Sequence, residues 1–243
     1  MCFHNALSAQ AKNLENRYKA KFEPQSKFEP IFHLSAFSHA KWPVITNHEK
    51  EIINEYYWGL IPSWTKTKED SKKIRTFTLN AVAETAFDKP SFRKSIANKR
   101  CIVPTTGFFE WQSVNSKKYP YFISLKNTSV FSLAGLWDDW TDIATGEIIR
   151  TFSILTTQAN PLLEKIHNTK KRMPVILSPE NETNWIDNNL TKEDILLLCV
   201  PFNENLMQAH TVSKLVSSKK EYTNQPEVQN PYIYPELSLG LEL

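Results

Sequence analysis

The sequence contains no apolar run that approaches the roughly 20 residues a membrane-spanning helix requires. Its N-terminus also lacks the basic region and apolar stretch of a secretory signal peptide. Cysteine is scarce: the three present, at positions 2, 101 and 199, form an odd number without the spacing of a disulfide framework. We therefore expect a reduced, cytoplasmic protein that is neither inserted in a membrane nor stabilised by disulfides.

The chain also lacks a strong charge of either sign. Its 29 Lys and Arg residues are nearly matched by 26 Asp and Glu residues, which gives a formal net charge of +3. This balance does not by itself indicate a polyanionic partner, because only the distribution of charge can do so. Basic residues gather in short runs at 72–75, 93–94, 99–100 and 170–172, and such runs usually form a solvated face.

Hydrophobic residues make up 41% and aromatic residues 12% of the 243 residues, which is enough for a substantial core. Beyond Pro30 the hydrophobic pattern is typical of strands. The predicted strands cover residues 31–37, 44–46, 52–60, 77–81, 101–103, 107–112, 121–125, 130–137 and 148–156.

Helices are predicted at five places. One is expected to begin just after Cys2, and others lie near 91–98 and 160–166. Ser178-Pro179-Glu180 resembles a helix start with Pro in the first turn, and Thr191 begins a sequence typical of a capping box. The first of these helices is predicted from the helical spacing of Leu7, Ala11, Leu14 and Tyr18.

Strands mixed with a few helices indicate an α+β fold with a curved, barrel-like and mostly antiparallel sheet. No shift in composition marks a linker, so we expect a single domain over residues 1–218. Residues 219–243 carry Pro226, Pro231 and Pro235 and are expected to form an extended tail.

Cys2 is a candidate nucleophile because it becomes the N-terminal residue when Met1 is removed. The α-amine then titrates near ~8 and the thiol near ~8.5, so both are partly reactive at neutral pH. With an aldehyde, the amine forms an imine and the thiol then closes a five-membered thiazolidine. An internal cysteine lacks the amine. Position alone favours the simpler interpretation that the second residue is Cys by chance.

Several motifs occur in order along the chain and resemble the SRAP family, the SOS-response-associated peptidases now understood as abasic-site-processing proteins. The resemblance runs from residue 1 to about Val216. It rests on Met1-Cys2, Trp58-Gly59-Leu60-Ile61-Pro62-Ser63-Trp64, Asn80-Ala81-Val82-Ala83-Glu84-Thr85, Gly107-Phe108-Phe109-Glu110-Trp111, Ala134-Gly135-Leu136-Trp137, Thr156-Thr157-Gln158-Ala159-Asn160, Ile166-His167, Arg172-Met173-Pro174-Val175 and His210-Thr211-Val212-Ser213.

The resemblance implies four catalytic residues. Cys2 matches the residue that forms a thiazolidine with the ring-opened deoxyribose, and Asn80 matches an Asn that holds the N-terminal residue and the sugar. Glu110 matches the general acid/base of sugar opening, and His167 matches a His that assists proton transfer at the sugar oxygen and the imine. A carboxyl and an imidazole suit this task if their pKa values fall near neutrality.

Each of these residues also has an ordinary structural interpretation. Glu110 lies in an aromatic strand, where a polar residue usually faces solvent. His167 follows a helical stripe and is equally compatible with a capping histidine, and Asn80 with a turn. Cys101 and Cys199 lie in apolar runs and are expected to be inert core thiols.

The expected DNA contacts depart from the family pattern. Trp64 lies where the family places an apolar wedge against unstacked bases. The family commonly begins Cys-Gly-Arg, with a DNA-contacting Arg at the position of His4, so His4 is a candidate DNA-binding residue here. Val82 replaces a second DNA-facing Arg, and Lys170 and Arg172 are expected to compensate for both losses.

Three functions are compatible with these residues. The first is an abasic-site sensor that crosslinks to single-stranded DNA through Cys2, protects the lesion and cleaves the strand as a minor lyase when the imine fails to close. The second is a cysteine peptidase or autoprotease that uses Cys2 and His167. The third is a DNA-binding scaffold with a decayed site. We expect a monomer without cofactor or metal, bound to the nucleoid through damaged DNA.

Overall fold

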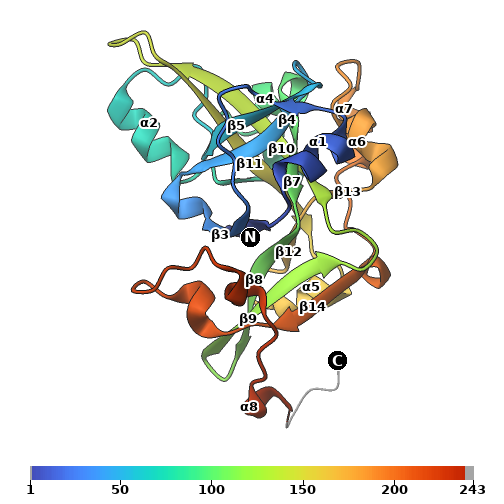
Figure 1. Cartoon of the computed structure of the whole chain (residues 1–243). Coiled ribbons are helices and arrows are strands. Elements are labelled where there is room, and N and C mark those ends of the chain that lie inside the picture. The colour runs from blue at the N-terminus through green and yellow to red at the C-terminus, as the bar shows by residue number, and fades with distance from the viewer. Residues whose placement is uncertain (1, 239–243) are drawn as a thin grey trace.

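The computed structural model describes residues 2–238, and a closed barrel of five strands forms its centre (Figure 1). The ring runs from β11 through β10, β7 and β4 to β5 in antiparallel pairs, and the parallel pairing of β5 with β11 closes it. Closure leaves none of these five strands without a partner on either side. The barrel strands are β4 (Lys41–Thr46), β5 (Ile52–Trp58), β7 (Arg100–Thr105), β10 (Phe131–Thr141) and β11 (Ile148–Gln158).

A smaller antiparallel sheet lies below the barrel in Figure 1, in the order β14-β9-β8-β1-β3. Its central members are β8 (Gly107–Val114) and β1 (His4–Leu7), so the N-terminal segment is paired on both sides. The other three strands are β3 (Ile31–Ser35), β9 (Lys117–Leu125) and β14 (Met207–Thr211).

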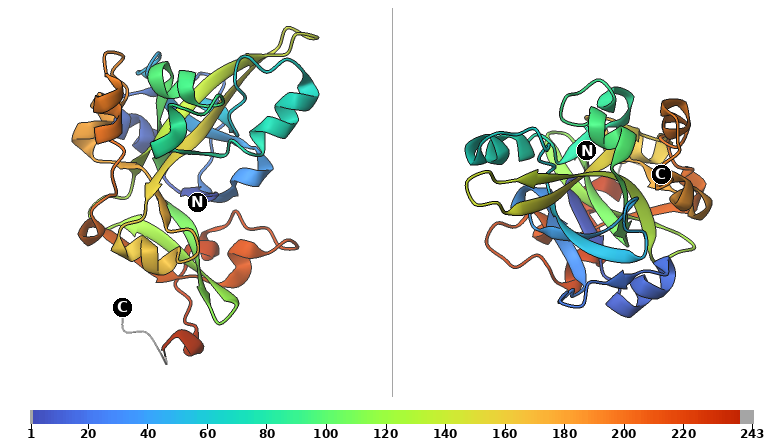
Figure 2. Two further views of the ribbon diagram at one scale, coloured as in Figure 1. Left: turned by 180° about the vertical axis from the view of Figure 1, so that it is seen from behind. Right: turned by 90° about the horizontal axis from the view of Figure 1, so that it is seen from above.

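Short strands and helices complete the architecture. Viewed from above, the helices lie around the outside of the barrel (Figure 2). The remaining strands are β2 (Lys21–Phe22), β6 (Asn80–Val82), β12 (Arg172–Pro174) and β13 (Ile176–Leu177). The helices are α1 (Ala11–Tyr18), α2 (Lys68–Arg75), α3 (Ala83–Ala86), α4 (Arg93–Asn98), α5 (Pro161–Ile166), α6 (Pro179–Trp185), α7 (Lys192–Leu197) and α8 (Pro235–Ser238).

The α+β class and the barrel-like sheet are confirmed, but one local prediction is wrong and some elements were missed. The first helix begins at Ala11 rather than just after Cys2, because residues 4–7 pair with β3 and β8 as a strand. Helices α2 and α3 were not predicted, since α2 is almost entirely polar and α3 has only four residues. The capping box of Thr191 and the helix start at Ser178-Pro179 are confirmed.

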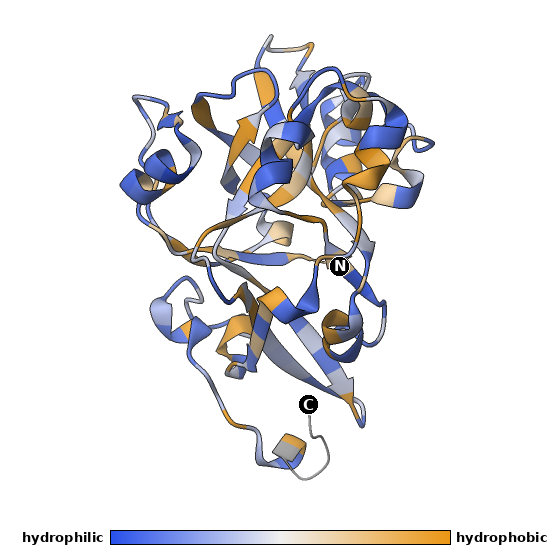
Figure 3. Ribbon diagram, turned by 90° about the vertical axis from the view of Figure 1, so that its right-hand side faces the viewer, coloured by the Kyte–Doolittle hydropathy of each residue, from blue (hydrophilic) through white to orange (hydrophobic). Residues whose placement is uncertain are grey.

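Apolar side chains fill the barrel and the space between it and the smaller sheet. Figure 3 shows apolar residues along strands inside the molecule and hydrophilic residues on the segments around them. Cys101 and Cys199 are buried, as expected. No helix between residues 2 and 238 is long and apolar enough to span a membrane.

The two faces of β8 contact different parts of the core. Phe108 belongs to the large cluster that includes the barrel residues, whereas Phe109 belongs to a small cluster on the opposite face. Side chains alternate along a strand, so Glu110 points to the same face as Phe108, between sheet and barrel. Both faces of this strand are therefore covered where Glu110 lies.

The C-terminal tail covers both edges of the smaller sheet. At β3, Asn224 Oδ1 accepts hydrogen bonds from the backbone N–H groups of Phe32 (2.7 Å) and His33 (3.3 Å). At β14, the tail pairs with Thr211 through Tyr232, whose N–H donates to the Thr211 carbonyl at 2.8 Å. The tail is not simply extended, because residues Pro226–Gln229 and α8 form helical turns. It thus satisfies edge groups that would otherwise be open to pairing with other chains.

We predict that Asn224→Ala lowers the free energy of unfolding by about 1–3 kcal/mol, because it removes the acceptor from two N–H groups at the edge of β3. Urea unfolding measures the change. Asn230→Ala is the matched control, since Asn230 lies in the same tail and is exposed. Equal stability of the two variants would show that the tail does not hold this edge.

Candidate active site

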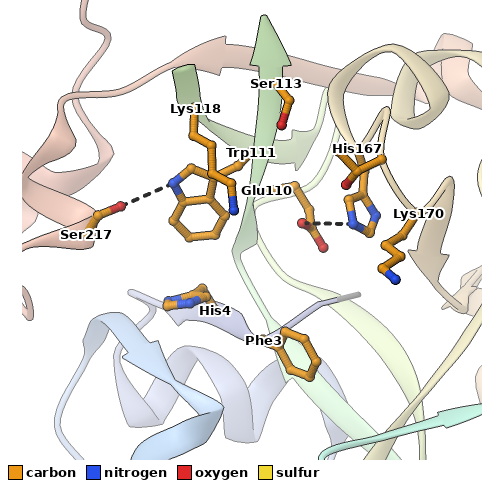
Figure 4. Close-up of a pocket in the computed structure, with 10 residues that line it drawn as sticks. Phe3, His4, Glu110, Trp111, Ser113, Lys118, His167, Lys170 and Ser217 are labelled. Atoms are coloured by element: carbon orange, nitrogen blue, oxygen red, sulfur yellow. Dashed lines mark hydrogen bonds and ion pairs between the residues drawn. The ribbon is translucent and has the colours of Figure 1, made fainter. Parts of the chain in front are cut away.

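A cavity of about 390 Å³ opens where β1, β8 and the end of α5 meet (Figure 4). Its position follows from the fold, because β1 and β8 are paired neighbours and α5 packs against β8. Acidic, basic and aromatic side chains face one another across it. They belong to Phe3, His4, Glu110, Trp111, Ser113, Lys118, His167, Thr169, Lys170 and Ser217.

Glu110 lies at the inner side of this cavity and is only 4% exposed. Burial raises the pKa of its carboxyl group to about 7, because the charged form loses hydration. The sequence-based alternative that Glu110 faces solvent is therefore wrong. A carboxyl with this pKa exists in both protonation states near neutrality, as a group that both donates and accepts protons requires.

His167 faces Glu110 from the end of α5. Two hydrogen bonds between Asn168 and the backbone of Ser113 connect this helix end to β8. His167 Nδ1 donates to the carbonyl of Arg172 at 2.9 Å, which leaves Nε2 directed at Glu110 Oε2, 3.8 Å away. Burial lowers the pKa of His167, so the neutral imidazole presents an acceptor nitrogen to the carboxyl group.

Cys2 lies close to this acid–imidazole pair and is completely buried. Burial raises the pKa of its thiol, and the negative charge of Glu110 raises it further. The thiol donates a hydrogen bond to Asn5 Oδ1 at 3.5 Å. Cys2 is therefore held as a neutral thiol beside the cavity, not as a thiolate.

His4 lines the cavity but carries little positive charge. Its Nδ1 is 2.9 Å from Nε2 of His33, whose Nδ1 is in turn 2.8 Å from Thr223 Oγ1. Burial, and then the neighbouring His33, lower the pKa of His4 to about 3, while burial lowers that of His33 to about 4. The two imidazoles form a neutral hydrogen-bonded pair that links the cavity to the C-terminal tail.

Trp111 and Lys118 are cavity residues that the sequence did not reveal. The ring of Trp111 lies edge-on to His4 at 4.7 Å, and its Nε1 donates to Ser217 Oγ at 3.1 Å. In Figure 4, Lys118 and Lys170 appear on opposite sides of Glu110. Alternation along β8 predicts that Trp111 points away from the face of Glu110, and Lys118 lies on the neighbouring strand β9.

Asn80 lies at the start of β6, beside Ile154 of β11, and is 8% exposed. Neither its amide oxygen nor its amide nitrogen has a hydrogen-bond partner within residues 2–238. It does not line the cavity described above. Both hydrogen-bonding groups of this amide are therefore available to a ligand.

Two predicted DNA contacts, Trp64 and Arg172, do not line the cavity. Trp64 is 48% exposed and lines a separate hollow, with its Nε1 donating to the carbonyl of Pro90 at 3.2 Å. Arg172 forms a two-pronged ion pair with Glu84 at 2.8 Å and also donates to the Thr156 carbonyl. Lys170, unlike Arg172, is exposed and lines the cavity.

No group of three or more metal-binding side chains occurs in the part of the chain that the structure describes.

The profile of the SOS response associated peptidase (SRAP) family matches residues 1–219, which include the whole cavity. The chain belongs to the SRAP family. Over 231 residues it is 36% identical to the abasic site processing protein YoqW of Bacillus subtilis, covering 94% of this chain and 98% of that protein. It is 28% identical to the abasic site processing protein HMCES of Xenopus tropicalis, covering 83% and 66% of the two chains.

Two solved structures share the fold of this chain. A crystal structure of a protein from Bacteroides thetaiotaomicron superposes with a TM-score of 0.90 at 41% identity, over 96% of this chain and all of that one. A protein from Bordetella bronchiseptica shares the fold with a TM-score of 0.76 at 23% identity, over 87% of this chain and all of that one.

This SRAP protein thus combines a buried acid–imidazole pair with a cavity whose N-terminal wall is neutral. His4 cannot replace an arginine electrostatically, since its imidazole is uncharged near neutral pH. Val82 is likewise uncharged. The exposed cations at the cavity are Lys118 and Lys170, from β9 and the segment after α5.

We predict that Glu110→Gln changes the pH dependence of stability. Because folding raises the pKa of Glu110 from 4.5 to about 7, its stabilising contribution is complete below pH 4.5 and is lost as pH rises through 7. The variant should therefore gain up to about 3 kcal/mol relative to the wild type between pH 4 and pH 8. Urea unfolding at several pH values measures this gain.

Glu29→Gln, at an exposed position, controls for the change in net charge. A constant difference between Glu110→Gln and the wild type across this pH range would contradict a raised pKa for Glu110.

Proposed function

We propose that this protein processes abasic sites in single-stranded DNA. After removal of Met1, it captures these sites covalently through Cys2. The observation that carries this proposal is the position of the Cys2 thiol beside the buried Glu110–His167 pair, with 3.8 Å between Glu110 Oε2 and His167 Nε2. Family membership and the names of the curated relatives support the same substrate.

The first step is opening of the deoxyribose ring. An abasic sugar is mostly a closed hemiacetal, so a proton must leave its 1′ hydroxyl while another reaches the ring oxygen. Neutral His167 accepts the first proton on Nε2, and protonated Glu110 donates the second. The proton then returns from His167 to Glu110, and the products are a free aldehyde and a regenerated pair.

The second step joins the aldehyde to the N-terminal residue. The α-amine of Cys2 attacks the aldehyde carbon, and loss of water gives an imine. The Cys2 sulfur then attacks the imine carbon, the thiol proton is lost to the site, and the nitrogen gains a proton. The resulting thiazolidine prevents β-elimination, whereas an imine that does not close leads to strand cleavage and a minor lyase activity.

Asn80 fits a role in holding the substrate. An amide does not titrate, so it contributes hydrogen bonds rather than proton transfer. Both polar atoms of Asn80 are buried without partners in residues 2–238, so both can form hydrogen bonds to a bound ligand. We assign it to the sugar and the N-terminal residue.

The peptidase alternative fits the geometry less well. A nucleophilic cysteine of a peptidase is activated by a lowered thiol pKa or by an adjacent histidine base. Here burial raises the pKa of the Cys2 thiol, and His167 Nε2 is directed at Glu110 instead. A neutral thiol is compatible with ring closure, because the amine and not the thiol makes the first attack.

The decisive test mixes protein of verified N-terminal mass with single-stranded DNA that carries one abasic site. We expect a heat-stable crosslink on a denaturing gel with the wild type and none with Cys2→Ala. Cys2→Ser should give an unstable adduct and more strand cleavage, because oxygen closes the ring less stably than sulfur. A crosslink formed by Cys2→Ala would assign the nucleophile to another residue and overturn the proposal.

A second test concerns the DNA contacts. Lys170 is exposed at the cavity and has no ion pair within the described part of the chain, whereas Arg172 is paired with Glu84. Lys170→Gln should therefore weaken binding and reduce the slope of log affinity against log salt by about 0.7. Arg172→Gln should leave this slope nearly unchanged, and fluorescence anisotropy titrations measure both. Equal slopes for Lys170→Gln and the wild type would exclude a phosphate contact at Lys170.

A further inference from the structure

Asn5 is a completely buried polar residue in the middle of the smaller sheet. Its backbone is aligned with Leu34 of β3 on one side and with Phe108 of β8 on the other. Because β1 is paired with β3 on one side and with β8 on the other, the backbone position of Asn5 is fixed. Asn5 follows Cys2 by three residues in the sequence, and the two side chains are hydrogen-bonded.

The amide of Asn5 is only partly satisfied. Its oxygen accepts a hydrogen bond from the Cys2 thiol at 3.5 Å, a usual length for a sulfur donor. Its nitrogen is buried and has no hydrogen-bond partner among residues 2–238. A buried amide with an unused donor stabilises the fold less than an apolar side chain of the same shape would. The residue therefore fits a role at the thiol better than a role in packing.

We propose that Asn5 is a positioning residue that holds the Cys2 sulfur in the orientation required for thiazolidine closure. This inference rests on the proposed function, because it concerns the second of the two covalent steps. The hydrogen bond restricts rotation about the Cα–Cβ bond of Cys2. Sulfur then stays near the place where the imine carbon forms.

The chemistry of closure explains why both ends of the amide matter. Before closure the sulfur carries a proton, and this thiol donates a hydrogen bond to Asn5 Oδ1. During closure a carbon–sulfur bond forms, the carbon–nitrogen double bond becomes single, the sulfur loses its proton and the nitrogen gains one. The N–H₂ group of the same amide then donates to the sulfur as negative charge develops, after a rotation about the Cβ–Cγ bond.

The hydrogen bond between Cys2 and Asn5 also affects which of two competing reactions the imine undergoes. Closure protects the DNA, whereas delay allows β-elimination and strand cleavage. The amine attack does not involve the sulfur, so a change at Asn5 acts on the partition between these outcomes. A purely structural role for Asn5 would instead reduce all products together.

The experiment uses the full chain without Met1 and single-stranded DNA with one abasic site. Three products are measured in the same samples: heat-stable crosslink, imine trapped by borohydride and cleaved strand. For Asn5→Leu we expect the heat-stable fraction of all adducts to fall at least about tenfold, with more trapped imine and more cleaved strand, because misplacement of a reacting atom is costly. Asn5→Asp keeps an oxygen at the same reach and should retain more closure than Asn5→Leu.

Asn16→Leu is the matched control, because Asn16 is exposed on α1. Thermal unfolding of each variant verifies that it is folded at the assay temperature. An unchanged heat-stable fraction in folded Asn5→Leu, with a wild type that crosslinks normally, would overturn the role of Asn5 alone. Absence of any Cys2-dependent adduct from the wild type would instead overturn the proposed function.

Discussion

The site depends on the packing of the smaller sheet against the closed barrel. This packing covers the face of β8 that carries Glu110, and the loss of hydration raises the pKa of its carboxyl group to about 7. The same packing brings the end of α5 to β8, where Asn168 and Ser113 are hydrogen-bonded and His167 reaches Glu110. An exposed Glu110 would be fully ionised at neutral pH and could not donate a proton.

Several features of the site reduce stability, as is common where a fold supports chemistry. Glu110 favours its protonated state in the folded protein, and the amides of Asn5 and Asn80 include buried atoms without partners in residues 2–238. The barrel offsets these costs, because its five strands are paired all round and its interior is apolar. The rigid part of the molecule thus supports a small set of groups that are arranged for a ligand.

The C-terminal tail connects to the same region. It covers the edge of β3 through Asn224, and Thr223 reaches His33 and, through it, His4 at the cavity. The wall formed by His4 is neutral, so positive charge for a DNA backbone comes from exposed lysines beside the cavity, of which Lys170 is the one predicted from the sequence. Arg172, predicted with it, is instead engaged by Glu84.

The sequence by itself determined the fold class, the family and the residue types at the site. Strand-like alternation and motifs such as Gly107–Trp111 are local patterns, so they can be read along the chain. Tertiary structure decided what each residue does there. Residues 4–7 form a strand only because β3 and β8 lie beside them, against a helical spacing that continues through Leu7. Glu110 is buried, Trp111 faces a cavity and Arg172 is paired because of neighbours from distant segments. Burial and hydrogen bonding between such segments determine the pKa values of the site and which of its hydrogen-bond donors are available. These contacts join residues that are far apart in the sequence, so local spacing does not predict them.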